Sequence, residues 1–419
     1  MSAERFTDVR SLLTAFARTM NLINPEIENH HQQTAYLSYM LAYQMGLRDR
    51  SLENCVYAAL LHDIGSVMLE GKTSVIEIES DAGRISQLSA QMLEDIPGLS
   101  GTAEIISICQ SSWKDIQFLL SAGRLSSRDC ALAASAIHMA DAISTMLCED
   151  IPVLQQRRAM IKNAQLLKGR EFAEETVDAL EQLADREFVW LDLKYNPQFL
   201  MIFTGEIRYL SLDRTVELTR IMSRVIDYRS SFTAMHSAGV AAAAVKLAEL
   251  SGMTPEECKM MRIAGNLHDI GKLTTPKEIL EKPGKLTDDE FDVIKEHPYF
   301  TRLTLMNING FDRIGDWAGY HHEKLNGRGY PFKFGAERLD KGSRIVAIAD
   351  IFSAITEVRP YRDGMKKPEA IKVLEQNAAS GATCPELTKL LVDNYDIIDK
   401  AREAESAEAG KRFFESLQK

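Results

Sequence analysis

Apolar residues recur at three- and four-residue spacing along most of the chain, whereas the alternating pattern of a half-buried strand is scarce. Helix ends are also legible: Thr287 and Glu290 have the spacing of a capping box, and Gly252 and Gly310 follow periodic runs. Examples of the predicted helices are residues 9–20, 34–45, 131–147, 216–225 and 240–250. The pattern predicts an all-α fold.

The pentapeptide Leu-His-Asp-Ile-Gly occurs twice, at 61–65 and 267–271, each time within an apolar helical stretch. The His and Asp of each copy are therefore expected to be buried. Burying an imidazole and a carboxylate costs several kcal/mol unless they are paired or bind a metal. The repeat therefore suggests a duplicated metal-binding unit.

The residues around the two pentapeptides repeat as well. A His precedes each doublet His by 32 residues, and an Asp follows the doublet Asp after 78 residues in the first copy and 81 in the second. The sets are His30, His62, Asp63 and Asp141 in the first copy, and His236, His268, Asp269 and Asp350 in the second. His31 competes with His30 for the first position.

A chain of 419 residues is too long for one ordinary core, and the repeat predicts two tandem helical domains. The first is predicted over residues 1–205, with a core at about 1–150 and a packed helical connector over 151–205. The second is predicted over residues 206–419.

Composition narrows the function classes. The net charge of −11 argues against binding to a nucleic acid polymer, so a phosphate-bearing ligand would need local cations or metals. The six Cys are scattered and predicted to be reduced thiols. No signal pattern and no run of about 18 apolar residues is evident, so we expect no membrane association and a cytoplasmic location.

Five of the nine histidines fall in the second copy. Mixed imidazole and carboxylate ligands suit Fe, Mn, Co, Ni or Zn better than Mg or Ca alone. His321 and His322 are adjacent and fit best at a helix end, where both can reach one cluster. There are enough ligands for two ions, which together acidify a bound water and clamp a phosphoryl transfer, as in a hydrolase. The metal-ligand candidates are His236, His268, Asp269, His297, His321, His322 and Asp350.

Three cations follow these ligands in the sequence. Lys272 comes directly after the second pentapeptide, and Arg359 and Arg362 flank a Pro-Tyr pair just after Asp350. In a chain this acidic, these side chains are the candidates for a local phosphate grip.

The second copy resembles the HD-GYP family of bacterial cyclic-dinucleotide phosphodiesterases. The ordered match runs from His236 to Arg362. It includes Leu-His-Asp-Ile-Gly-Lys, His297-Pro298 and His-His-Glu-Lys-Leu-Asn-Gly-Arg-Gly-Tyr-Pro at 321–331. The Gly-Tyr-Pro segment separates this family from other HD hydrolases.

The resemblance implies a two-metal site in which Asp269 is shared. One ion would be bound by His236, His268, Asp269 and Asp350, and the other by Asp269, His297, His321 and His322. Some members bind a third metal through a Glu at the position of Phe232, so we expect two ions, with Fe or Mn favoured and Ni, Co or Zn as alternatives.

By the same resemblance, Asp269 and Lys272 are catalytic residues, and Lys272 contacts the scissile phosphate. Arg359 and Arg362 grip phosphates, and Tyr330 belongs to a lip that recognises guanine or a partner. Two assemblies are candidates: a homodimer, and a complex in which a diguanylate cyclase-type partner binds the Gly-Tyr-Pro segment.

The implied reaction is hydrolysis of a 3′-5′ phosphodiester in cyclic di-GMP or 3′,3′-cyclic GMP-AMP to a linear dinucleotide. The tandem arrangement resembles the cyclic GMP-AMP enzymes of vibrios. Two alternatives are a cyclic-dinucleotide receptor or scaffold without turnover, and a broader HD-superfamily nucleotide phosphohydrolase.

The first copy lacks several of these residues. Ser66 stands in place of Lys272, and the sequence alignment places Gln91 opposite His297 and Ser111 and Ser112 opposite the His pair. Three interpretations are open: a structural unit with a buried polar network, a one-metal ligand sensor and a second hydrolase. We expect the first copy to regulate or stabilise the second rather than to catalyse.

Overall fold

The computed structural model describes residues 5–21, 29–68, 81–94, 96, 98–195, 209–229, 235–282, 284–357 and 363–417. These residues form two compact units. The N-terminal unit is Phe16–Arg208, and the C-terminal unit is Tyr209–Lys419 together with Met1–Ala15. The division differs from the predicted one at the N-terminus, because the first fifteen residues group with the C-terminal unit.

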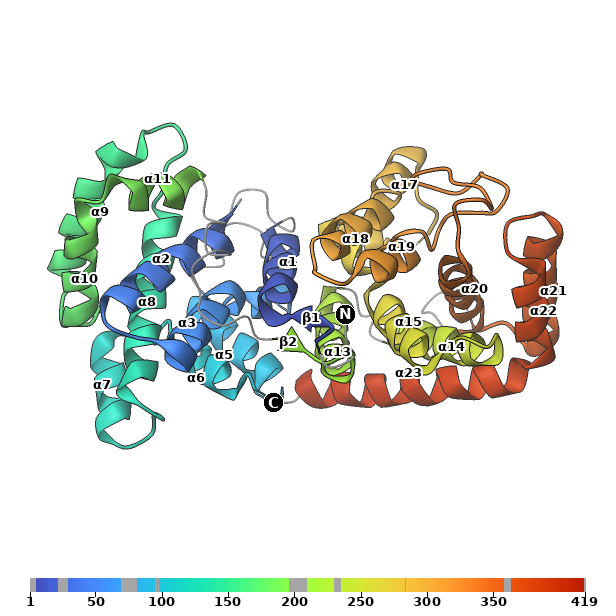
Figure 1. Cartoon of the computed structure of the whole chain (residues 1–419), viewed down its shortest axis with the longest axis horizontal. Helices are drawn as coiled ribbons and strands as arrows, with labels where there is room; N and C mark the ends of the chain where they lie inside the picture. Colours follow the sequence, from blue (N-terminus) through green and yellow to red (C-terminus); the bar gives the residue numbers. More distant parts are fainter. Residues whose placement is uncertain are drawn as a thin grey trace. The chain divides into compact units, whose positions relative to one another are not determined.

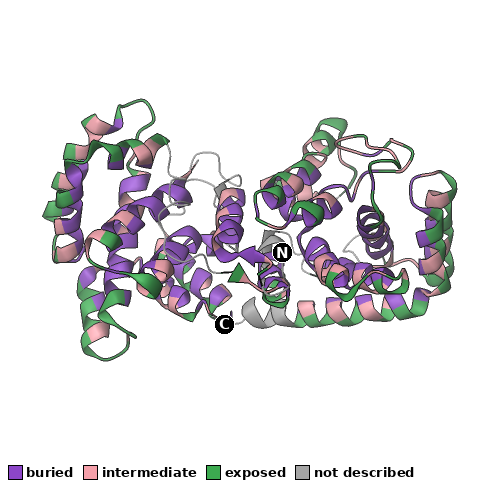
Figure 2. Ribbon diagram, viewed as in Figure 1, coloured by how far each residue is buried: buried purple, intermediate pink, exposed green. Residues whose placement is uncertain are grey.

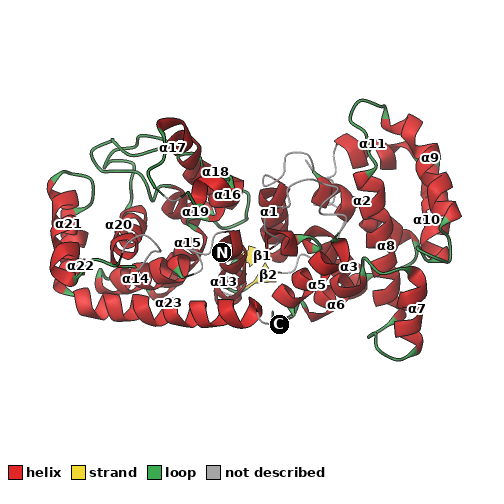
Figure 3. Cartoon of the chain, turned by 180° about the vertical axis from the view of Figure 1, so that it is seen from behind, coloured by secondary structure: helices red, strands yellow, loops and turns green. Residues whose placement is uncertain are grey.

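Helices make up nearly all of the secondary structure in the described part of the chain, which confirms the all-α prediction (Figure 3). The exceptions there are two isolated β-bridges and a two-residue strand pair, in which β1 (Thr7–Asp8) runs antiparallel to β2 (Tyr209–Leu210). None of the described helices is both long and apolar enough to cross a membrane. All six cysteines are free thiols, as predicted.

In the N-terminal unit, α2 packs against both α3 and α8 (Figure 1). The connector predicted over 151–205 forms three helices as far as residue 195, and α10 and α11 pack on α2. Helix α1 contains the boundary between the units. The elements are α1 (Val9–Asn21), α2 (His30–Gln44), α3 (Asp49–Leu61), η2 (Ile64–Met68), α5 (Ala82–Leu93), α6 (Ser100–Ile108), α7 (Trp113–Ser121), α8 (Arg128–Thr145), α9 (Val153–Leu166), α10 (Glu174–Ala184) and α11 (Glu187–Tyr195).

In the C-terminal unit, α14 packs against α15, α20 and α23. The long α23 runs beneath α14 in Figure 1. The elements are α13 (Leu212–Arg229), α14 (His236–Leu250), α15 (Pro255–Leu267), η4 (Ile270–Thr274), α16 (Lys277–Leu280), α17 (Asp288–Ile294), α18 (His297–Met306), α19 (Asp312–Gly319), α20 (Lys341–Thr356), α21 (Lys367–Ala379), α22 (Pro385–Asp393) and α23 (Tyr395–Leu417).

Small residues allow the central helices of the C-terminal unit to lie close together. Helix α14 contains four consecutive alanines at 241–244, all buried. A Cβ on Gly265 of α15 would lie only 2.5 Å from Cα of Ala241, so the two backbones are nearly in contact there. Most of α20 is buried as well (Figure 2). These helices form the rigid frame from which the candidate ligands project.

The helices and helix ends predicted from the sequence are present in the structure. The five predicted segments fall on α1, α2, α8, α13 and α14. Thr287 caps α17 by accepting a hydrogen bond from the backbone N–H of Glu290, and the Glu290 side chain completes the capping box. Gly252 and Gly310 follow α14 and α18 with φ of 78° and 86°, the left-handed conformation that favours glycine after a helix.

The N-terminal segment is bound to the C-terminal unit by more than the strand pair. Asp8 accepts a hydrogen bond from the Asn309 side chain at 2.7 Å and another from the Ser11 hydroxyl at 2.9 Å. The ring of Phe6 lies 5.9 Å from that of Phe311. Asn309 and Phe311 lie in the loop between α18 and α19, so residues 5–15 pack against the connection between these two helices.

Candidate metal centre

The seven predicted metal ligands of the C-terminal unit come from the ends or interiors of five helices and lie together. His236 and His297 are the first residues of α14 and α18, whereas His268 caps the C-terminus of α15. His321 and His322 follow the end of α19, as their adjacency predicted, and Asp350 lies within α20. Helix ends suit ligands because the chain changes direction there and side chains from several helices can converge.

Asp269 occupies the middle of the cluster and is 1% exposed. Its Oδ2 lies 3.2 Å from Nε2 of His268, and its Oδ1 lies 3.4 Å from Nε2 of His297 and 3.8 Å from Nε2 of His321. The carboxylate therefore faces imidazoles on both sides, which is the placement of a bridging ligand between two ions.

A second carboxylate lies on the far side of His268. Oδ1 of Asp350 is 3.2 Å from Nε2 of His236, and its Oδ2 is 3.8 Å from Nδ1 of His322. Burial opposes ionisation, but His236 and the other neighbouring imidazoles outweigh it and hold the pKa of Asp350 well below its usual value. The cluster therefore contains two anionic carboxylates.

Backbone carbonyls fix the orientation of three imidazoles. Nδ1 of His268 lies 2.8 Å from the carbonyl of Gly265, and the His297 and His321 rings make the same contact with the carbonyl three residues earlier, both at 2.6 Å. A carbonyl only accepts, so Nδ1 carries the proton in each ring and Nε2 presents a lone pair to the cluster.

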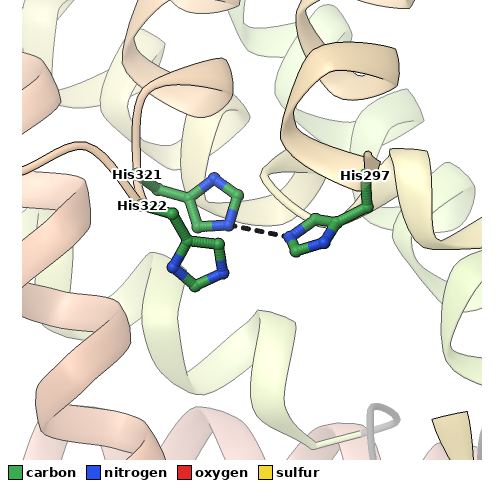
Figure 4. Close-up of side chains that lie close together, drawn as sticks. All are labelled: His297, His321 and His322. Carbon is green, nitrogen blue, oxygen red and sulfur yellow. Dashed lines mark hydrogen bonds between the residues drawn. The ribbon is translucent and has the colours of Figure 1, made fainter. Parts of the chain in front are cut away.

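These lone pairs face one another without an intervening proton. Nε2 of His297 and Nε2 of His321 are 3.2 Å apart, as the dashed line in Figure 4 shows. Burial lowers the pKa of His297 to about 3 and that of His321 to about 4, so both rings are neutral at pH 7. Two acceptors at this distance repel each other unless a cation lies beside both.

The buried acceptors therefore fit metal ions. Nε2 of His268 and Oδ1 of Asp269 are fully buried and have no hydrogen-bond partner, a costly arrangement without a ligand. Ligand atoms gather in three groups: His236 with His268 and Asp350, His268 with Asp269 and His321, and His297 with His321 and His322. Neutral imidazoles and carboxylates are ligands for first-row divalent ions.

Glu357 is a member of the site that sequence reasoning missed. Its Oε2 lies 2.9 Å from Nδ1 of His236, taking the place that a backbone carbonyl has behind the other imidazoles. Burial alone would lower the pKa of His236, but Glu357 and Asp350 outweigh it and raise that pKa to about 10. The available signal was the seven-residue spacing from Asp350, which puts both carboxylates on one side of α20 and its end.

The predicted phosphate-binding residues divide into two groups. The Lys272 ammonium lies 2.6 Å from Oδ2 of Asp269, with 22% of its side chain exposed, so it reaches the edge of the cluster. The Tyr330 ring lies 4.8 Å from that of His322. Arg359 and Arg362 lie outside the described residues, as does Phe232.

The Gly-Tyr-Pro segment is held against the His pair by backbone contacts. Gly329 packs so closely that a Cβ there would lie 2.6 Å from the carbonyl oxygen of His322. The buried Glu323 carboxylate accepts hydrogen bonds from the backbone N–H groups of Phe332, Lys333 and Phe334 at 2.7–3.1 Å. Glu323 therefore fixes the loop and does not face the metal ligands.

The glycine of each pentapeptide allows a neighbouring helix to approach. A Cβ on Gly271 would overlap the carbonyl oxygen of His297, and a Cβ on Gly65 would lie 2.6 Å from the carbonyl oxygen of Ile85. The N–H of Gly271 donates to the Thr301 hydroxyl at 3.0 Å, and that of Gly65 donates to the Ser89 hydroxyl at 2.8 Å. Helix α18 in one unit therefore corresponds to α5 in the other.

The N-terminal unit contains a smaller cluster of the same kind. Nε2 of His30 is 3.2 Å from Oδ1 of Asp141, and Nε2 of His62 is 3.2 Å from Oδ2 of Asp63. His30 rather than His31 faces the two carboxylates, at 3.2 Å from Asp141 and 3.7 Å from Asp63. Burial lowers the pKa of His30, but the two aspartates outweigh this effect and raise it to about 9.

The sequence alignment was wrong about which residues of the N-terminal unit correspond to His297, His321 and His322. The shared glycine contact places Ile85, not the exposed Gln91, opposite His297. At the same separation of 212 residues, Cys109 and Gln110 stand opposite His321 and His322, in place of Ser111 and Ser112. Gln110 donates to Oδ2 of Asp141 at 2.7 Å, as His322 faces Oδ2 of Asp350. Six more residues separate the doublet from the facing helix in the second copy than in the first, and this placed Gln91 opposite His297.

The chain is similar to several known proteins. An HD domain family model matches residues 220–385. The 3′3′-cGAMP-specific phosphodiesterase 1 of Vibrio cholerae is 28% identical over 404 residues, 92% of each chain. A cyclic di-GMP phosphodiesterase of Pseudomonas aeruginosa is 38% identical over 142 residues, 34% of each chain. The crystal structure of a cyclic GMP-AMP phosphodiesterase of Vibrio cholerae, V-cGAP3, matches with a TM-score of 0.63 at 20% identity over 93% of this chain and 98% of that one, so the fold is shared.

Proposed function

We infer that this chain is a metal-dependent cyclic-dinucleotide phosphodiesterase of the HD-GYP type, with its active site in the C-terminal unit. The observation that carries the inference is the set of buried imidazoles that converge on Asp269 and Asp350, among which His297 and His321 are neutral acceptors. The similarity to named cyclic-dinucleotide phosphodiesterases supports the substrate class.

The ligand set would bind two ions, with His236, His268, Asp269 and Asp350 on one side and Asp269, His297, His321 and His322 on the other. Two divalent ions there would supply Lewis-acid charge to the phosphoryl group and acidify an attacking water. The residues themselves keep the imidazoles in one tautomer, since three of them donate from Nδ1 to a backbone carbonyl. These three imidazoles therefore need no change of tautomer before they bind an ion, whereas His236, whose pKa is raised to about 10, must lose its proton first.

Lys272 is proposed to contact the scissile phosphate. Its ammonium is already at the cluster, 2.6 Å from Asp269, and is partly exposed. A fixed cation at this point stabilises the negative charge that develops on the phosphoryl oxygens in the transition state. Tyr330 is proposed to contact a base or ribose beside His322, and Arg359 and Arg362 are proposed to bind phosphates.

Among cyclic dinucleotides, we propose 3′,3′-cyclic GMP-AMP as the preferred substrate. The relative that matches both units of the chain carries that name, whereas the cyclic di-GMP phosphodiesterase reported above matches about a third of the chain. The product is a linear dinucleotide. Cyclic di-GMP is the second candidate, because the metal ligands and Lys272 act on the phosphodiester and not on the base.

The proposal also covers the setting of the enzyme. Fe or Mn is the expected metal, with Ni, Co or Zn as alternatives, because first-row divalent ions accept mixed imidazole and carboxylate ligands. We propose a cytoplasmic enzyme, with a homodimer and a cyclase-type partner at the Gly-Tyr-Pro segment as candidate assemblies. Metal analysis of anaerobically purified protein tests the identity of the ion. Light scattering tests whether the protein is a homodimer.

The function is tested by product analysis. Anaerobically purified protein is incubated with cyclic di-GMP and the cyclic GMP-AMP linkage isomers in Mn²⁺ or Fe²⁺, and products are separated by chromatography. The double variant His268→Ala/Asp269→Ala serves as the control, with circular dichroism to verify its helices. We expect linear dinucleotide from the wild-type protein and none from the variant. Equal turnover by both proteins would show that the site is wrongly assigned, and tight binding without turnover would favour a receptor.

A further inference from the structure

The N-terminal unit contains a buried cluster that the proposed reaction does not use. His30 comes from the start of α2, His62 and Asp63 follow α3, and Asp141 lies in α8. All four ligand atoms lie within 3.7 Å of a partner in the cluster, and His62 is completely buried. Such a group is costly to bury unless it is fully paired or binds a cation.

One atom of this cluster has no suitable partner. Nδ1 of His62 donates to the carbonyl of Ala59 at 2.9 Å, so Nε2 is the atom that faces the carboxylates. Nε2 lies 3.2 Å from Asp63 and 3.5 Å from Asp141, yet it has no hydrogen-bond partner. A proton on Nε2 would meet neither carboxylate in good hydrogen-bond geometry, whereas a cation between the three groups would be bound by all of them.

The cluster has the geometry of half the C-terminal site. The paired distances are equal: 3.2 Å from His30 to Asp141 as from His236 to Asp350, and 3.2 Å within both His-Asp doublets. The carbonyl three residues before the doublet His accepts from its Nδ1 in both units. The frame that presents these four ligands is therefore intact.

The imidazoles that would bind a second ion are missing there. Ile85, Cys109 and Gln110 replace the three imidazoles of the other half of the C-terminal site. Ile85 is buried and apolar, and the buried Cys109 thiol lies 3.4 Å from the Ser86 hydroxyl. Gln110 uses its amide as a donor to Asp141. The cluster is thus limited to a single cation.

We propose that the N-terminal unit binds one first-row divalent metal ion through His30, His62, Asp63 and Asp141. The ion would cross-link α2, the end of α3 and α8 through its ligands, and it would take no part in hydrolysis. It can enter from solvent, because the Asp63 and Asp141 side chains are 12% and 18% exposed. This site does not depend on what the C-terminal unit hydrolyses.

The competing arrangement is a metal-free network in which both imidazoles are protonated and paired with the two aspartates. This network uses the same four residues as the proposed metal site, and both arrangements have a net charge of zero. The two arrangements therefore differ in whether a metal ion is bound. A purely structural network would be indifferent to chelators, whereas a metal site would lose stability with them.

The experiment uses the full chain in the His268→Ala/Asp269→Ala background, which removes ligands of the C-terminal site. The protein is purified with Mn²⁺, Fe²⁺ or Zn²⁺, and bound metal per chain is measured by mass spectrometry. We expect one ion per chain, and its loss when His62→Gln/Asp63→Asn is added. The matched control is His138→Gln, which changes a histidine of α8 whose ring packs on Phe172 and is not a proposed ligand. This variant should retain the ion.

Melting curves with and without a chelator provide a second measurement that needs no change in the cluster. In the same background, saturating metal should raise the melting temperature of the N-terminal unit by roughly 5–10 °C. A background protein that binds no metal and melts identically with chelator would overturn the proposal and establish the protonated network. A metal content that is unchanged between the background protein and its His62→Gln/Asp63→Asn variant would overturn it as well.

Discussion

The two ligand clusters share one frame and differ in what surrounds it. In both units a His-Asp doublet follows a helix, and its His donates to the carbonyl three residues before it. The C-terminal unit adds three imidazoles and a lysine, whereas the N-terminal unit has Ile85, Cys109, Gln110 and Ser66 at those places. The four-residue frame is therefore a property of the fold, and the capacity for two-metal chemistry lies in the residues added to it.

The largest difference should appear when the doublet aspartates are exchanged for asparagine. We expect Asp269→Asn to lower kcat by about 10³-fold or more, because a bridging carboxylate is lost and two ions contribute several kcal/mol to the transition state. The equivalent Asp63→Asn should leave kcat unchanged. Steady-state rates on the cyclic dinucleotide check both variants, and comparable losses would mean that the N-terminal cluster also catalyses.

Lys272 provides the next test. Lys272→Gln should lower kcat by about 10²-fold, the usual effect of removing one preorganised cation or donor from a transition state, with the metal content kept. Ser66→Ala, at the equivalent position, should change neither rate nor metal content. A Lys272→Gln enzyme that lost its metal instead would show that the lysine supports Asp269 and does not contact the phosphate.

Glu357 and Ser144 distinguish the two units by what lies behind the first imidazole. Glu357→Ala should weaken metal binding to the C-terminal unit by about 10–100-fold, the range typical of a carboxylate behind a metal-bound imidazole, while Glu357→Gln should weaken it less. Ser144 makes the equivalent contact with His30 at 3.2 Å. Ser144→Ala should lower the free energy of unfolding by about 1 kcal/mol and leave the C-terminal metals in place. Metal titrations of the three variants and denaturant unfolding of Ser144→Ala supply the measurements.

The smallest effects on activity are expected from the pentapeptide glycines. Gly65→Ala and Gly271→Ala should each lower the free energy of unfolding by about 1–3 kcal/mol, because a Cβ meets the neighbouring helix backbone in both units. Only Gly271→Ala should also lower kcat, since the backbone it displaces is that of His297. Equal activity of the two variants, measured after confirming their folded state, would contradict a ligand role for His297.

The sequence was sufficient to predict the all-α fold and to name seven side chains that the C-terminal unit brings together. Helical periodicity is strong in this chain, and the ligands occur in ordered motifs whose spacing is set by helix length. His321 and His322 illustrate this, since their adjacency alone placed them at a helix end, as observed after α19.

Contacts between distant segments were beyond sequence reasoning. The loops after the two doublets differ in length, so Gln91 was aligned with His297 although Ile85 occupies that position in space. Glu357 was overlooked because its partner His236 is 121 residues away in the chain. Both failures concern side chains whose roles depend on packing between helices and have no local signal.

The strand pair between residues 7–8 and 209–210 makes the N-terminal unit an insertion within the C-terminal one. During synthesis on the ribosome, β1 emerges about 200 residues before the strand that it pairs with. The N-terminal unit can therefore fold first, whereas the C-terminal unit can complete its fold only after its last helices have been synthesised. Cutting the gene between the repeats would remove Asp8 and Ser11 from the loop that joins α18 to α19. An excised catalytic unit would accordingly need residues 5–15 fused back to its front.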